Sequence, residues 1–183
     1  MKLPSSNKKH VASRRLIKGR KHFSKSVMAS VAVSKAGKTS VHFIDKGTKV
    51  DASYYRKTLL QRCLLPDIRQ KSDDHFVFQQ DGAPSHRAKS TVEFLQRTVP
   101  NFIEPSVWPP NRPDLNPVDC AVWGALQQSV YRIPISNLDD LKDRVRTCWE
   151  SLNQQITNKS IDQWRDRLKA VVRVNGGHIE QLF

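Results

Sequence analysis

Residues 76–90, FVFQQDGAPSHRAKS, decide the fold prediction because an apolar, strand-like run ends in a turn and leads into a helix. Asp-Gly is a strong hairpin signal when strands flank it on both sides, but here only the preceding side is strand-like. After Pro84, apolar residues recur with helical spacing, at Ala88, Val92, Leu95 and Val99. The stretch therefore predicts a strand, a turn and a helix over residues 86–98. Asp81 would lie at the carboxyl end of the strand, the edge of an open α/β sheet where ligands usually bind.

Length and composition indicate one globular domain. The chain has 183 residues, of which 38% are hydrophobic, and no apolar run reaches the length of a membrane-spanning helix. The first residues lack the apolar core of a signal peptide. Three scattered cysteines, Cys63, Cys120 and Cys148, form no CxxC pair, which indicates reduced thiols in a cytosolic or nuclear protein. We expect neither a membrane partner nor a small-molecule substrate.

The elements around this stretch complete a mixed α/β pattern. Two β-rich runs, residues 26–34 and 40–45, are joined by the turn KAGK and predict a hairpin. A helix is predicted over residues 54–65, with Pro66 ending or kinking it. Residues 101–108 predict a short extended segment, followed by the proline-punctuated loop PPNRPDLNP. This order predicts an α/β sheet of mixed strand direction.

Three helices are predicted to close the chain. The first spans residues 117–131, with Pro117 in its first turn. The other two are predicted to begin at capping-box patterns, Ser136-x-x-Asp139 and Ser160-x-x-Gln163. Trp149 and Trp164 fall on the apolar stripes of these helices, so we interpret them as core residues.

The charge of the chain points to a polyanionic partner. The formal net charge is +14, and residues 1–25 hold nine Lys and Arg and no acidic residue. Nucleic acid is the simplest such partner, because cationic side chains that neutralise phosphates release counterions. The candidate DNA contacts are Lys8, Lys9, Arg14, Arg15, Lys18, Arg20 and Lys21. A solvated basic tail or a nuclear-import signal remains the alternative for this basic N-terminal segment.

A second carboxylate, Asp119, occurs in a similar context. It lies in PDLNPVDCAVWG, just inside the start of a helix that follows a short strand. If the two short strands are neighbours, Asp81 and Asp119 can face one cation. Phosphodiester chemistry uses such carboxylates to hold Mg²⁺ or Mn²⁺. The alternative for Asp119 is a favourable acidic residue near a helix N-terminus.

Two motifs in order resemble a known family. FVFQQDGAPSHRAKSTVEFL and VWPPNRPDLNPVDCAVWGALQQSVY resemble the DDE/D catalytic domain of mariner-superfamily transposases, and the similarity extends over about residues 20 to 183. The resemblance implies a ribonuclease H-like mixed sheet flanked by helices, with extra C-terminal helices, and DNA as the partner. It implies catalytic and metal-binding roles for Asp81 and Asp119, which 37 residues separate, with Mg²⁺ or Mn²⁺ as the cofactor.

The chain departs from the family pattern in three ways. Arg112 stands where the family usually has a small residue, and we expect no helix-turn-helix pair before the catalytic domain. The family also carries a first catalytic aspartate on a central strand upstream of the basic stretch, and we expect both to be missing here. Asp45 cannot replace that aspartate, because it would end a strand two places away, about 10 Å from the required position. Residues 26–183 are therefore interpreted as an incomplete ribonuclease H-like domain.

Three functions agree with these features. The first is a transposase-derived, nuclear DNA-binding protein with an incomplete metal site, which either acts alone or forms a homodimer. The second is an active metal-dependent transposase or nuclease fragment that another chain completes by donating a strand. The third is a basic adaptor that uses the old fold to bind a protein partner. Metal-dependent DNA cleavage separates the first two, and salt-sensitive DNA binding separates both from the third.

Overall fold

The computed structural model describes residues 26–109, 112–175, 177, 179 and 183. The basic N-terminal segment, with its seven candidate DNA contacts, lies outside the described residues, so the division into residues 1–25 and 26–183 stays a prediction.

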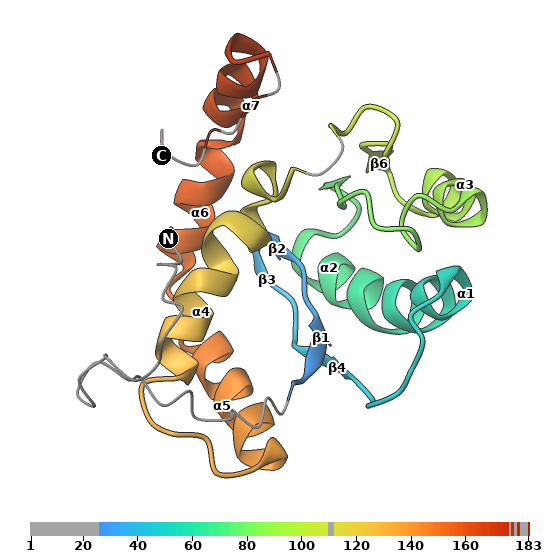
Figure 1. The fold of residues 1–183 in the computed structure, drawn as a ribbon. Helices are drawn as coiled ribbons and strands as arrows, with labels where there is room; N and C mark the ends of the chain where they lie inside the picture. Colours follow the sequence, from blue (N-terminus) through green and yellow to red (C-terminus); the bar gives the residue numbers. More distant parts are fainter. Residues whose placement is uncertain (1–25, 110–111, 176, 178, 180–182) are drawn as a thin grey trace, which may run out of the picture.

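Four short strands come first among the described residues, helices and two further strands alternate in the middle, and helices follow to the C-terminal end (Figure 1). The strands are β1 (Met28–Ser30), β2 (Val33–Ser34), β3 (Gly37–Lys38), β4 (His42–Ile44), β5 (Val77–Phe78) and β6 (Asn101–Phe102). The first half of the chain also holds the helices α1 (Ala52–Tyr54), η3 (Tyr55–Leu64), α2 (Leu65–Ser72) and α3 (Lys89–Thr98). The second half holds η4 (Pro113–Leu115), η5 (Val118–Val122), α4 (Trp123–Val130), α5 (Leu138–Glu150), α6 (Gln154–Asp162) and α7 (Trp164–Arg173).

The strands form three pairs of mixed direction. β1 pairs with β4, and β2 with β3, both antiparallel, so residues 26–45 form the predicted hairpin. Gly37 supplies the positive φ of 137° that its turn requires. β5 and β6 pair in parallel, with Phe78 opposite Phe102. Among the described residues no hydrogen-bonded ladder joins β1 or β4 to β5 or β6. The mixed α/β fold class is confirmed.

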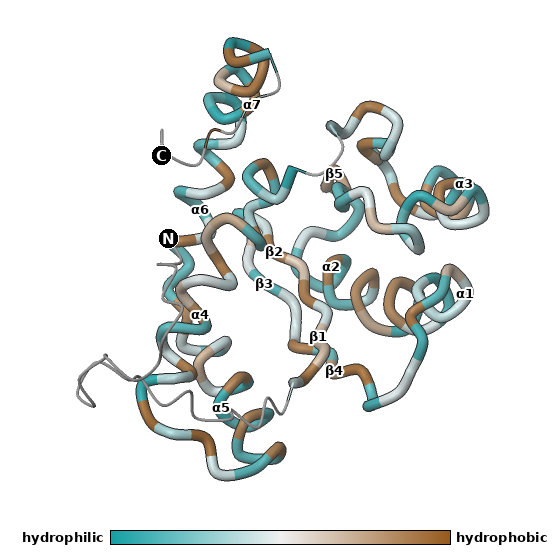
Figure 2. Tube along the Cα trace, in the orientation of Figure 1, coloured by the Kyte–Doolittle hydropathy of each residue, from teal (hydrophilic) through white to brown (hydrophobic). Residues whose placement is uncertain are grey.

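The hairpin lies between two helical layers (Figure 1). Neighbouring residues of a strand point to opposite faces. Val31 and Val33 pack toward α4 and α5, whereas Ala32 packs toward η3 and α2. Hydrophobic residues recur along the helices on both sides of the hairpin, as Figure 2 shows. Trp149 of α5 is buried, and its indole N–H donates a 2.7 Å hydrogen bond to the Thr39 carbonyl oxygen.

A third apolar cluster holds the C-terminal end of the chain. Trp108, Leu115 and Val171 are buried together there. The ring of Trp164 stacks on that of Trp108 at a centroid distance of 6.4 Å. Both tryptophans predicted to be core residues are therefore packed, Trp149 fully and Trp164 in part. No helix among the described residues has the length and apolarity needed to cross a bilayer.

The helix that was predicted to end or kink at Pro66 continues to Ser72. A π-helical segment ends at Leu64, where the hydrogen-bond pattern changes to that of an α-helix. Pro66 lies in the first turn of the α-helix, where its missing N–H removes little. The predicted end at Pro66 was wrong, because a proline in the first turn of an α-helix interrupts no α-helical hydrogen bond.

Both predicted capping boxes were wrong. Asn137, not Ser136, caps α5, because the Asn137 side chain accepts the Asp140 N–H. Ser160 is buried inside α6, a helix that the sequence did not predict as separate, and its hydroxyl faces the Pro117 carbonyl oxygen. Helix α3 begins at Lys89, three residues later than predicted, because the residues before it form turns.

Candidate active site

The Asp81 carboxylate is held by the turn that follows β5. Its Oδ1 accepts the Ala83 N–H at 3.0 Å and lies 2.5 Å from His86 Nδ1. The hydrogen bond from His86 is the main reason that the pKa of Asp81 lies below its ordinary value; burial opposes it and the Ala83 N–H adds to it. The aspartate of the strand–turn–helix unit is thus ionised and fixed in orientation.

Two buried residues, Tyr55 and Gln80, hold His86 in place. The Tyr55 ring packs on the His86 ring with a centroid distance of 4.1 Å. The Tyr55 hydroxyl donates to Gln80 Oε1 at 2.7 Å, and Gln80 Nε2 donates to the His86 carbonyl oxygen at 3.0 Å. Burial, and then the charge of Asp81, raise the pKa of Tyr55, so this hydroxyl stays a donor. Through Tyr55, helix η3 therefore supports the loop that carries Asp81.

Asp119 lies in the first turn of η5 and is oriented by Asn116. The Asn116 Nδ2 donates to Asp119 Oδ2 at 2.9 Å, while its Oδ1 accepts the Val118 N–H at 3.1 Å. Burial is the larger cause that raises the pKa of Asp119, and the charge of Asp81 is the second. The second effect requires the two carboxylates to be near each other, so the structure brings together both predicted site residues.

Two cavities meet at these carboxylates. The first, of about 290 Å³, separates the hairpin from β5, and the second, of about 750 Å³, opens between the β5–α3 turn and the proline loop. Asp81 and Asp119 line both. Arg87, Trp108 and Arg112 also line the second cavity. The Arg112 guanidinium reaches Asp114 and the Gly177 carbonyl oxygen, so the residue that departs from the family pattern ties the loop to the C-terminal end.

The donors at this point suit one divalent cation. Asp81 Oδ2 and Asp119 Oδ1 accept no hydrogen bond from any described residue. Mg²⁺ is commonly held by one or two carboxylates and several waters. Within the described ranges, no group of three or more His, Cys, Asp or Glu side chains could hold a metal ion. At this point the described residues therefore offer two carboxylates, Asp81 and Asp119, each with one oxygen that accepts no hydrogen bond from a described residue.

The structure also separates what the sequence could and could not show about this site. Asp45 is exposed and lines neither cavity, in agreement with its rejection as a substitute ligand. Asn116, Tyr55 and Gln80 were not predicted as supports. Asn116 had a local signal, since it lies three residues before Asp119, but the contacts of Tyr55 exist only in three dimensions.

Comparisons with known proteins agree with this geometry. No protein-family profile matches the chain. It is 28% identical to the Tc1 transposase of Caenorhabditis elegans over 120 residues, which are 66% of the chain and 42% of that transposase. It is 28% identical to the Tc3 transposase of the same organism over 155 residues, or 84% of the chain and 45% of that relative. The chain thus spans less than half the length of these curated relatives.

Solved structures of known proteins share the fold of this chain. The catalytic domain of the Mos1 mariner transposase matches with a TM-score of 0.72 and 18% identity over 84% of this chain and 76% of that one. The Mos1 paired-end complex with Mn matches with a TM-score of 0.75 and 18% identity over 87% of this chain and 47% of that one. By its sequence the chain is similar to Tc1/mariner transposases, and its ribonuclease H-like fold is that of the Mos1 mariner catalytic domain.

Proposed function

We propose that the chain is a transposase-derived DNA-binding protein whose Asp81 and Asp119 hold one Mg²⁺ or Mn²⁺ ion weakly. One observation carries this proposal: two carboxylates converge on shared cavities, and the charge of Asp81 raises the pKa of Asp119. Two like charges in one site repel each other, and a divalent cation between them removes that cost.

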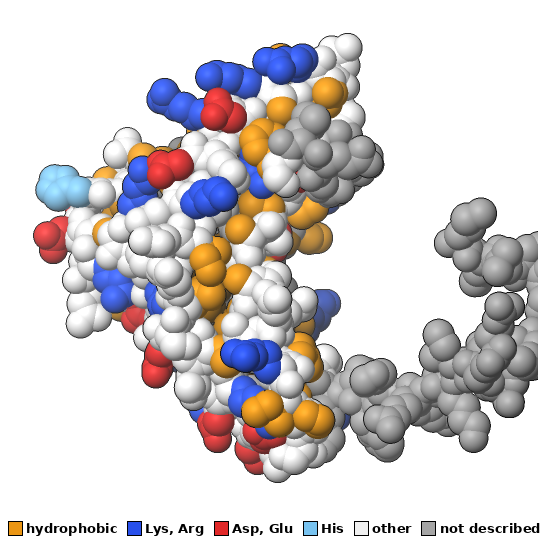
Figure 3. Space-filling model, turned by 90° about the vertical axis from the view of Figure 1, so that its left-hand side faces the viewer, with side chains coloured by type: hydrophobic (Ala, Val, Ile, Leu, Met, Phe, Trp, Pro, Cys, Tyr) orange, Lys and Arg blue, Asp and Glu red, His pale blue; other side chains and the backbone are white. Residues whose placement is uncertain are grey.

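DNA as the partner has three supports. Structural neighbours include Mos1 complexes named as the paired-end complex with left transposon end and the strand transfer complex. The net charge of +14 favours a polyanion. Lys and Arg side chains also gather on the outer surface of the α7 end of the molecule (Figure 3), where Arg165, Lys169 and Arg173 are exposed.

The metal has a support of its own. Mos1 catalytic domains have been solved with Mg and with Mn. A bound divalent ion would polarise a phosphodiester and stabilise the leaving oxygen. His86 keeps Asp81 ionised and oriented, and Asn116 orients Asp119. The exposed Arg87 on the wall of the second cavity is placed to contact a phosphate.

We propose further that binding occurs without cleavage, because two carboxylates hold a metal less firmly than the three that the resemblance implies for the family. Action in the nucleus and pairing of two copies on DNA belong to the same proposal, and the Mos1 paired-end complexes favour the pairing.

The test is a fluorescence-anisotropy titration of a labelled duplex at increasing salt, combined with a plasmid-nicking assay in Mg²⁺ and in Mn²⁺. Salt-sensitive binding without nicking is expected. Binding that does not respond to salt would favour a protein-binding adaptor instead.

Nicking that requires Asp81 would favour the second candidate, an active fragment completed by another chain. One observation favours that candidate: the cavity of about 290 Å³ reaches from the sheet to both carboxylates.

A further inference from the structure

The C-terminal helices hold the segment that contains the second carboxylate. Helices α6 and α7 lie beside residues 112–119, the η4–η5 segment (Figure 1). From α7, the Arg167 Nη1 donates to the Asp114 carbonyl oxygen at 3.2 Å. From α6, the Ser160 hydroxyl donates to the Pro117 carbonyl oxygen at 3.4 Å. Side chains of two separate helices therefore contact the backbone of one short segment.

Arg167 is an unusual residue for a buried position. It is 8% exposed, its Nη2 donates to Gln163 Oε1 at 3.4 Å, and its guanidinium lies over the Phe183 ring at 4.5 Å. Its Nε is buried and bonds to no described residue. Burying a guanidinium costs free energy, and an apolar side chain of similar volume would fill the space without that cost. Stability alone therefore gives no reason for an arginine here.

Asp114 is held a second time by Arg112. The Arg112 Nη1 lies 3.3 Å from Asp114 Oδ2, and it also donates to the Gly177 carbonyl oxygen at 2.9 Å. The Asp114 side chain is only 2% exposed. Asp114 is thus fixed through its carbonyl oxygen by Arg167 and through its carboxylate by Arg112, so η4 has little freedom to shift.

A short hydrogen-bonded path leads from Asp114 to Asp119. Helix η4 directly precedes Asn116, whose N–H donates to the Pro113 carbonyl oxygen at 3.1 Å. The Asn116 carbonyl oxygen accepts the Asp119 N–H at 3.0 Å, and the Asn116 side chain donates to Asp119 Oδ2 at 2.9 Å. A shift of η4 would therefore move Asn116, and with it the Asp119 carboxylate.

We infer that Arg167 is a positioning residue for Asp119. From α7 it holds η4, and through η4 and Asn116 it fixes the direction of the Asp119 carboxylate. Arg167 lines neither of the two cavities, so it acts on a bound ligand only through this segment. Its effect on a metal ion rests on the proposed function, whereas its effect on the η4–η5 segment does not.

The sign of the change in Mn²⁺ affinity separates position from charge. Arg167→Met removes a positive charge, which by itself would strengthen the binding of a cation. Loss of orientation would instead weaken binding, and we expect an affinity at least about threefold lower, measured by electron paramagnetic resonance of free Mn²⁺. Arg167→Lys keeps the charge and a donor, so its affinity should stay within about twofold of wild type.

Two variants control for charge and for stability. Arg146→Met makes the same substitution at an exposed position of α5, and Trp149→Phe removes a buried hydrogen bond in a different apolar cluster. Neither residue lines a cavity that contains the two carboxylates. Both variants should bind Mn²⁺ as wild type does. Equal weakening in Trp149→Phe and Arg167→Met would assign the effect to general loosening and would overturn the role of Arg167.

Amide hydrogen exchange without metal tests the segment by itself. In Arg167→Met, the Asp119 and Cys120 amides should exchange at least about tenfold faster, because the turn that protects them loses its anchor. The Thr39 amide, which is hydrogen-bonded within the hairpin, should be unchanged. Ser160→Ala removes the smaller contact with the same segment, should act in the same direction, and replaces Arg167→Met if that variant does not fold.

The outcomes distinguish this inference from the proposed function. Wild-type protein that does not bind Mn²⁺ would overturn the metal site, and the exchange rates would then decide the role of Arg167. Unchanged or tighter Mn²⁺ binding in Arg167→Met, or unchanged exchange, would overturn the inference and leave the metal site standing. Equal weakening in Arg167→Met and Arg167→Lys would also contradict it, because the donated hydrogen bond would not be the cause.

Discussion

The charge of Asp81 raises the pKa of Asp119, although 37 residues separate the two in the sequence. Asp81 is held by His86 from the turn after β5, and Asp119 by Asn116 from the loop before η5. Each carboxylate thus has its own support, and each keeps one oxygen that no described residue occupies. These free oxygens support the proposal that the two carboxylates share a cation.

Removing either carboxylate should weaken Mn²⁺ binding. Asp81→Asn and Asp119→Asn should each lower the affinity at least about tenfold, because a ligand that is lost costs no less than a supporting contact. Electron paramagnetic resonance of free Mn²⁺ measures the affinity, and Asp45→Asn, at an exposed position outside both cavities, is the matched control. Identical titration curves for all four proteins would remove the metal site.

The purified protein should not cut or join DNA in Mg²⁺. Two carboxylates are expected to hold the metal too loosely for the in-line displacement that the three family carboxylates support. Conversion of supercoiled plasmid to nicked or linear forms measures this. Turnover that disappears in Asp81→Ala would show an active site, and turnover that persists in that variant would identify a contaminating nuclease.

Salt should weaken DNA binding in proportion to the phosphates neutralised. If residues 1–25 contact about five phosphates, log K should fall with log salt at a slope of about −4 to −5. Deleting residues 1–25 should make the slope much shallower and lower the affinity similarly for two duplexes of unrelated sequence, since phosphate contacts carry no sequence information. An unchanged slope after the deletion would place the DNA-binding surface on residues 26–183.

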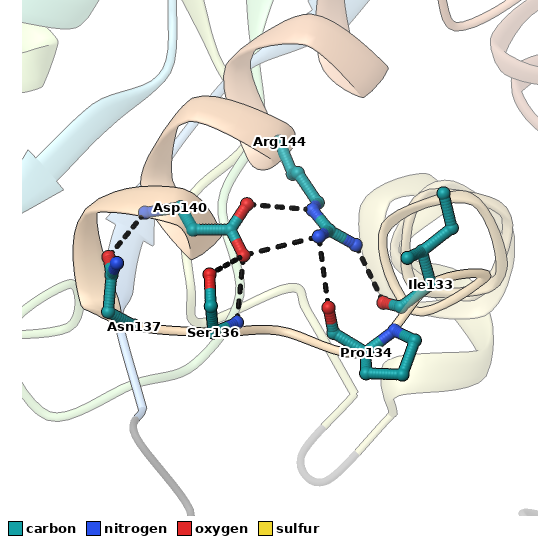
Figure 4. A network of polar contacts seen from close by, with 6 residues as sticks. All are labelled: Ile133, Pro134, Ser136, Asn137, Asp140 and Arg144. Atoms are coloured by element: carbon teal, nitrogen blue, oxygen red, sulfur yellow. Dashed lines mark hydrogen bonds and ion pairs between the residues drawn. The ribbon is translucent and has the colours of Figure 1, made fainter.

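Asp140 should stabilise the protein in a pH-dependent way. Its pKa is lowered to about 2, chiefly by hydrogen bonds from the backbone N–H and hydroxyl of Ser136 and then from Arg144, which also binds the Ile133 and Pro134 carbonyl oxygens (Figure 4). A lowered folded-state pKa gives stabilisation that is complete above the unfolded value of about 3.9 and is lost as pH falls through the folded value.

Thermal unfolding measures this effect. Asp140→Asn should unfold at a lower temperature than wild type at neutral pH, and the difference should shrink as pH falls from about 4 to about 2. The control is Asp143→Asn, because Asp143 is exposed and, among the described residues, pairs only with Arg146 three residues later. A difference that does not depend on pH would show that the carboxylate charge is not the cause.

Trp149→Phe should lower the free energy of unfolding by about 1–3 kcal/mol, because it leaves the buried Thr39 carbonyl oxygen without its donor. Urea unfolding measures the loss. Trp123→Phe should cost less, since Trp123 is only partly buried and its indole N–H makes no hydrogen bond with a described residue. Equal losses in the two variants would assign the effect to ring size instead of the hydrogen bond.

Local patterns were sufficient for several parts of this protein. Alternation of apolar residues predicted the hairpin, and helical spacing after Pro84 predicted α3 to within three residues. Asp81 and Asp119 could be singled out because each follows a strand-like run. These features depend on neighbours within a few positions, which a sequence displays directly.

Other local signals were outweighed by packing. Pro66 did not end its helix because a π-helical segment changes the hydrogen-bond pattern beside it. Ser160 had the residue type of a helix cap but is buried against the loop that carries Pro117. A cap motif describes a helix end in solvent, and tertiary contacts decide whether that end exists.

The identities of the two carboxylates, the basic composition and the order of strands and helices as far as α5 were already present in the chain of residues. The meeting of Asp81 with Asp119, the stacking of Tyr55 on His86 and the cavity between the hairpin and β5 were not. They join segments far apart in the chain, and their positions follow from how two helical layers pack on the hairpin. No periodicity within one segment encodes how close these segments come to one another, because side-chain packing between the layers sets it.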